Sequence, residues 1–100
     1  MKIDMTAPIL DISGEPLSSE GNPVILRTIV QAALLATTAA DANLDGAKKA
    51  RMFTLAMEAN KDAAEFKIED IALIKERIGM VSTPLAVGRS YELLDPPEDE

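Results

Sequence analysis

The middle of the chain carries oxygen-bearing side chains at the spacing of a calcium loop. Asp41, Asn43, Asp45 and Gly46 match the first half of an EF-hand loop, in which alternate side chains supply ligands and the glycine makes a sharp turn. The second half departs from this pattern, because Met52 stands where a bidentate glutamate is required. The favoured interpretation is a polar loop in which Asp45 caps the following helix, and the alternative is a small Ca²⁺-binding module.

A basic cluster follows this loop directly. Lys48, Lys49 and Arg51 fall within four positions at the expected start of a helix. Positive charge at a helix start opposes the helix dipole, which favours the hypothesis that these residues serve a role other than helix stability. The cluster is a candidate contact for an acidic protein partner or a phosphate. The alternative is a solvated face whose charges are balanced by nearby carboxylates.

The composition gives little support to catalysis. The sequence has no histidine and no cysteine, which removes the commonest acid–base catalyst and every thiolate ligand. Its serines stand in no motif that indicates a nucleophile, and its five glycines form no phosphate-binding loop. We therefore predict that the protein is not an enzyme and needs no cofactor.

The charge balance narrows the class of partner. The formal net charge of −7 disfavours direct binding to nucleic acid or to an anionic membrane. The first residues, MKIDMTAP, lack the apolar region of a signal peptide, which favours a cytoplasmic location. An acidic chain can also mimic nucleic acid and block a DNA-binding host protein. This would require rows of carboxylates on one face, whereas here they are spread from Asp4 to Glu100.

A long apolar segment must organise the elements that carry these residues. Residues 24–36, VILRTIVQAALLA, are too few to cross a bilayer and apolar enough to be buried as a helix. We predict an α+β fold, mostly helical, with a four-helix core around a helix at 24–37. The other helices are expected at about 46–60, 69–80 and 84–94. The predicted core consists of apolar side chains from all four helices: Leu26, Ile29, Val30, Ala33, Leu34, Phe53, Ile74, Ile78 and Leu94.

The two ends of the chain are expected to differ from this helical core. Alternating polar and apolar residues in 2–17, with Ser13-Gly14 between them, predict a small N-terminal β-hairpin. A short strand or an extended linker is expected near Phe66, and a close helix contact at Gly88. Residues 1–95 are predicted to form one domain, and 96–100 a disordered acidic tail. Because a lone hairpin is marginal in water and leaves open edges, residues 2–17 are expected to contribute to a homodimer.

Several longer segments together carry a resemblance: ILDISGEPL, QAALLAT, GAKKARMFTLAMEAN and IEDIALIKERIGMVSTPLAVGRSYELLD. They resemble an uncharacterised kind of small protein from tailed bacteriophages and prophages, over nearly all the chain up to Asp95. The resemblance brings no assigned activity and names no functional residue. It implies a phage origin in the host cytoplasm, with a role in assembly or against a host factor. The leading expectation is therefore a non-enzymatic protein–protein interaction module whose partner is a phage or host protein.

Overall fold

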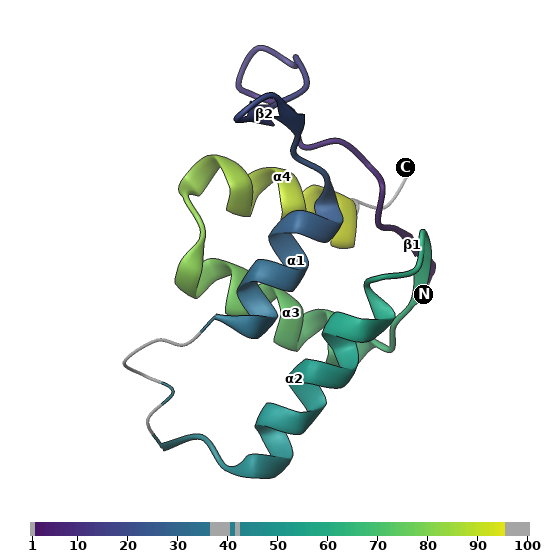
Figure 1. The fold of residues 1–100 in the computed structure, drawn as a ribbon, viewed down its shortest axis with the longest axis vertical. Helices are drawn as coiled ribbons and strands as arrows, with labels where there is room; N and C mark the ends of the chain where they lie inside the picture. The colour runs from purple at the N-terminus through teal and green to yellow at the C-terminus, as the bar shows by residue number, and fades with distance from the viewer. Residues whose placement is uncertain (1, 37–40, 42, 96–100) are drawn as a thin grey trace.

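The computed structural model describes residues 2–36, 41 and 43–95. These residues form an α+β fold that is mostly helical, as predicted (Figure 1). The elements in chain order are β1 (Lys2–Asp4), β2 (Ser18–Ser19), β3 (Asn22–Pro23), α1 (Leu26–Leu35), α2 (Gly46–Glu58), β4 (Ala63–Glu65), α3 (Ile68–Val81) and α4 (Pro84–Leu94). The predicted acidic tail, 96–100, lies outside the described residues.

Helix α1 lies at the centre of the fold, as its apolar sequence predicts. It contacts α2, α3 and α4, and Figure 1 shows it between them. Leu26, Val30, Ala33 and Leu34 are buried on its inner side, at helical spacing. The apolar face of a central helix must be covered on several sides, and the three other helices supply that cover.

The helix starts follow the capping residues in the sequence. Asp45 accepts a hydrogen bond from the Lys48 N–H at 2.8 Å at the start of α2. At the start of α4, Thr83 caps the helix and Pro84 occupies its first turn. Both starts therefore confirm the local prediction.

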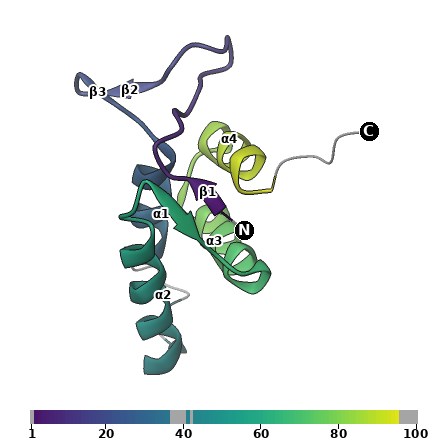
Figure 2. The same cartoon turned by 90° about the vertical axis from the view of Figure 1, so that its right-hand side faces the viewer.

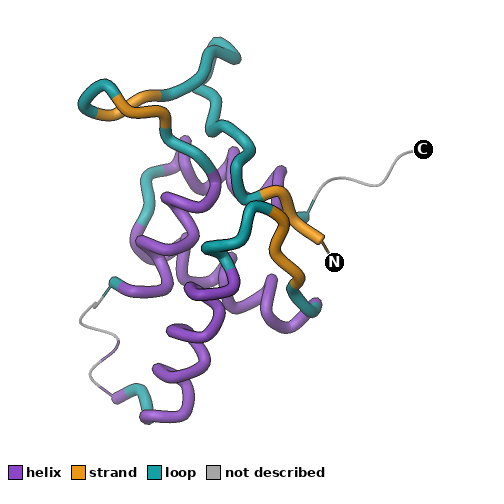
Figure 3. The backbone as a smooth tube through the Cα atoms, turned by 45° about the vertical axis from the view of Figure 1, so that its right-hand side comes forward, coloured by secondary structure: helices purple, strands orange, loops and turns teal. Residues whose placement is uncertain are grey.

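The predicted N-terminal hairpin is confirmed only in part, by an isolated antiparallel bridge between Leu10 and Pro16 across the Ser13-Gly14 turn, and the named strands pair elsewhere. β1 pairs antiparallel with β4, with Ile3 opposite Ala64, so its partner lies far along the chain (Figure 3). β2 and β3 form a separate short hairpin whose turn residues, Glu20 and Gly21, both have positive φ angles. That geometry matches the right-handed twist of the flanking strands. The extended segment near Phe66 is thus a strand that binds the N-terminus.

The core confirms most of the predicted residues and corrects one. Of the nine predicted core residues, seven are buried and Ile29 is partly buried against the core. Phe53 was predicted to be buried and is exposed, because α2 turns Met52, Leu55 and Ala56 inward instead. Among the described residues, no helix is long and apolar enough to cross a membrane.

Candidate functional site

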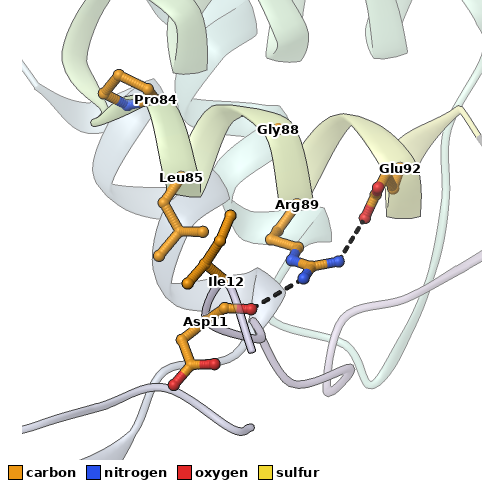
Figure 4. Close-up of a pocket in the computed structure, with 7 residues that line it drawn as sticks. All are labelled: Asp11, Ile12, Pro84, Leu85, Gly88, Arg89 and Glu92. Carbon is orange, nitrogen blue, oxygen red and sulfur yellow. Dashed lines mark hydrogen bonds and ion pairs between the residues drawn. The ribbon is translucent and has the colours of Figure 1, made fainter. Parts of the chain in front are cut away.

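A surface groove lies where the turn at 11–15 crosses α4 (Figure 4). Its volume is about 640 Å³, and it is open to solvent. We call it the Ile12 groove, and its lining residues are Asp11, Ile12, Pro84, Leu85, Gly88, Arg89 and Glu92. The lining is largely apolar, and its charged residues are Asp11, Arg89 and Glu92.

Hydrogen bonds within the turn order the backbone that carries Ile12. The Asp11 carboxylate accepts hydrogen bonds from the N–H groups of Ser13 at 2.8 Å and Glu15 at 3.0 Å. The Asp11 N–H donates to the Glu15 carbonyl at 2.7 Å, and Gly14 takes the positive φ angle that the turn requires. As a result the Ile12 side chain is 87% exposed, the most exposed large apolar side chain among the described residues.

Arg89 fastens this turn to α4. Its Nη2 donates to the Asp11 carbonyl at 2.8 Å, and its Nη1 lies 3.3 Å from Glu92 Oε1. Figure 4 shows the guanidinium between these two partners, beside Ile12. The contact joins residues 78 positions apart, so the groove depends on the tertiary fold.

Gly88 keeps the groove open on the α4 side. A Cβ atom built at this position meets no atom within 4 Å. The predicted close helix contact at Gly88 is therefore wrong, and the neighbouring helices do not require a glycine here. A glycine inside a helix costs about 1 kcal/mol relative to alanine. The residue leaves free space in a groove at the expense of helix stability.

The predicted calcium ligands make contacts within the protein. Both carboxylate oxygens of Asp41 accept hydrogen bonds from Arg77, at 2.6 Å and 3.0 Å. Asp45 is the cap of α2, and Asn43 is exposed. A cation at this loop would compete with the guanidinium for Asp41. Among the described residues no three His, Cys, Asp or Glu side chains are grouped to hold a metal ion, and the calcium site stays a prediction.

The basic cluster contacts α3. Arg51 Nη2 lies 3.0 Å from Asp70 Oδ1, and Lys48 Nζ lies 3.9 Å from Glu76 Oε2. Lys49 is exposed. These ion pairs join two helices at the surface, where such contacts contribute little to stability, and the binding of Lys48, Lys49 and Arg51 to an acidic partner stays a prediction.

The contact between α2 and α3 changes the pKa of Asp70. Burial favours its neutral form, but hydrogen bonds from the Lys67 N–H and from Arg51 outweigh burial and lower its pKa below the usual value. The charged form is therefore the one that joins α2 to α3. Arg51 and Asp70 were not paired by sequence reasoning, because the two residues lie on different helices.

The resemblance to small phage proteins depends on the sequence segments alone. It stays a prediction, and so does the interaction role that it implies. In comparisons with known proteins, no family model, curated protein or solved structure matches this chain.

Proposed function

We propose that the protein is a non-enzymatic protein–protein interaction module that binds its partner in the Ile12 groove. The observation that carries the proposal is the exposure of Ile12 at the tip of a turn held by hydrogen bonds. Because the turn is already ordered by hydrogen bonds, its backbone loses little conformational entropy on binding. An aliphatic side chain presented in this way can anchor an interface by filling a pocket of the partner.

The shape of the groove favours a segment of chain as its ligand. Its volume falls within the range of small-molecule clefts, about 300–1,000 Å³, but such clefts bury most of their ligand. The Ile12 groove is open, so it suits a peptide segment that lies across α4. Ile12 and Leu85 would pack against an aliphatic side chain of that segment.

The charges around the groove favour a basic partner. Two of the three charged lining residues, Asp11 and Glu92, are acidic, and Glu92 pairs with the third, Arg89. The whole chain has a net charge of −7. Opposite charge raises the association rate and excludes acidic competitors. We therefore expect a partner segment with Lys or Arg beside an aliphatic residue, from a phage or host protein in the bacterial cytoplasm.

The composition favours a non-enzymatic role. The sequence has no histidine, the commonest acid–base catalyst, and the Ser90 hydroxyl is buried in α4. The charged groups of the groove are Asp11, Arg89 and Glu92, two of which form a salt bridge. Such a lining is sufficient to bind a protein partner, whereas covalent catalysis would require an activated nucleophile.

The substitution Gly88→Ala should weaken binding in the groove without destabilising the fold. In Gly88→Ala the new Cβ enters the groove without touching the rest of the protein. We expect the free energy of unfolding to rise by about 0.5–1 kcal/mol, since alanine favours the helix. Peptides selected from a random library on the wild-type protein should bind this variant about tenfold more weakly, which corresponds to about 1.4 kcal/mol.

The matched control is Gly46→Ala at the start of α2, where a Cβ also meets no atom within 4 Å. This variant should bind the selected peptides like the wild type. A second groove variant, Ile12→Ser, should weaken binding without unfolding, because the side chain is exposed. The proposal is wrong if the selected peptides bind Gly88→Ala and Ile12→Ser as tightly as the wild type, or if the selection yields no peptide.

A further inference from the structure

Helices α1 and α2 expose a second apolar surface, apart from the groove. Leu35 is 59% exposed, Phe53 57% and Met57 60%. The two helices are in contact and lie on the same side of the molecule in Figure 2. Grouped apolar side chains of this size on a soluble protein mark an interaction surface. Phe53 is an aromatic residue, a type enriched at interface hot spots.

This surface carries no charge, which is unusual for the chain. The shallow depression between the helices is lined by Gln31, Leu35, Phe53, Ala56, Met57 and Asn60. None of these residues is charged, whereas 27% of the whole sequence is. We call this surface the α1–α2 face.

Two polar atoms of the α1–α2 face, Gln31 Nε2 and Asn60 Oδ1, already have partners in the chain. Gln31 Nε2 donates to the Ala56 carbonyl at 2.9 Å and lies 3.4 Å from Asn60 Oδ1. Burying a polar group costs free energy when it leaves a hydrogen bond unmade. Because these bonds are made inside one copy, covering the face costs less than its polar residues suggest.

We propose that the α1–α2 face binds a second copy of this chain in a symmetric dimer. Each copy has a net charge of −7, so two copies repel wherever carboxylates meet. The α1–α2 face brings together two uncharged surfaces and avoids this repulsion at the contact. A basic partner gains nothing there, since the face offers no carboxylate.

The size of the depression fits a side chain better than a ligand. Its volume is about 200 Å³, below the usual range of about 300–1,000 Å³ for small-molecule sites. In a two-fold dimer each copy presents the same patch, so Phe53 or Met57 of one copy enters the depression of the other. This interface differs from the predicted one at residues 2–17, where β1 already pairs with β4 in the same chain.

The test measures the mass of the full chain by light scattering at micromolar to submillimolar concentration. The wild type should reach twice the 10.7 kDa of one chain. Phe53→Glu and Met57→Lys should both be monomeric, with unchanged helical circular dichroism, because both side chains are exposed in one copy. Introducing opposite charges at the two positions distinguishes loss of an apolar contact from simple repulsion.

Ile68→Glu is the matched control, since Ile68 is also an exposed apolar side chain but begins α3. It should remain dimeric. Added salt should strengthen the dimer, because it screens the repulsion between two acidic bodies. A monomeric wild type, a dimer that survives Phe53→Glu and Met57→Lys, or a dimer equally lost in Ile68→Glu would each overturn the proposal.

Discussion

Arg77 and Asp41 form a buried, two-pronged ion pair between α3 and the segment that follows α1. Their side chains are 3% and 7% exposed, and the two oxygen–nitrogen distances are 2.6 Å and 3.0 Å. Arg77 also donates to the carbonyls of Ala33 and Ala36, at the C-terminal end of α1. The guanidinium therefore satisfies helix-end carbonyls and places positive charge at the negative end of the helix dipole.

Removal of either partner of this ion pair should lower the free energy of unfolding. Asp41→Ala leaves a buried guanidinium without its carboxylate, and we expect a loss of about 3–5 kcal/mol in the free energy of unfolding. Chemical denaturation followed by circular dichroism measures it. Arg51→Ala is the control, because the Arg51–Asp70 pair is more exposed and should contribute less than about 1 kcal/mol. Equal losses for the two variants would contradict a special role for the buried pair.

Ser90→Ala should stabilise the protein. Ser90 Oγ is buried in α4 and has no hydrogen-bond partner among the described residues. An unpaired buried hydroxyl costs about 1–3 kcal/mol, and alanine removes it while keeping the helix. The melting temperature should rise. A fall would mean that the hydroxyl makes a favourable contact, such as one with an ordered water molecule.

Acid should weaken the contact between α2 and α3 through Asp70. Its pKa is below the usual value in the folded state, so its contribution to stability is full above the unfolded pKa of about 3.9. The contribution is lost as the pH falls through the folded pKa. In Asp70→Asn, the free energy of unfolding should therefore be lower at neutral pH and should vary less between about pH 5 and pH 3.

Some acid sensitivity should remain in that variant. The pKa of Asp4 is lowered by hydrogen bonds from Thr6, chiefly from its hydroxyl, and that of Glu58 chiefly by the Glu65 N–H. Urea denaturation at a series of pH values gives both curves. A variant whose curve runs parallel to that of the wild type would show that Asp70 has the same pKa folded and unfolded.

Calcium should not bind tightly at the 41–46 loop. Both Asp41 oxygens accept from Arg77, and Asp45 Oδ1 accepts from the Lys48 N–H. Met52, at the position of the bidentate ligand, is buried in the core. Titration calorimetry with calcium chloride should show only the heat of dilution. A dissociation constant below about 1 mM, the weak end of the range for such loops, would instead support the alternative of a Ca²⁺-binding module.

The sequence was informative where local chemistry decides the structure. Asp45, Thr83 and Pro84 mark helix starts because their side chains or rings act within one turn. The central place of α1 follows from its composition, since a helix apolar on most sides must be covered. The Ser13-Gly14 turn was also recognisable, because Gly14 accepts a positive φ angle.

The sequence was less informative where the burial of a side chain depends on how the helices pack together. The spacing in α2 allowed either Phe53 or Leu55 on the inner face, and the packing of the helix against α1 buries Leu55. Arg77 is a charged residue late in α3, and no sequence pattern indicates that it is buried beside Asp41 and two carbonyl oxygens. The Ile12 groove is formed by residues near opposite ends of the chain, and no local sequence pattern predicts it.

The β1–β4 pairing also constrains the order in which a nascent chain can fold. Lys2–Asp4 finds its partner only in Ala63–Glu65, and the Met5 N–H donates to the Asp62 carbonyl at 2.8 Å. At a synthesis rate of about 5–20 residues per second, the partner strand follows about 60 residues and about 3–12 s later. Until then the backbone groups of the first strand lack this partner, so β1 can pair only after the segments that form α1 and α2 have been synthesised.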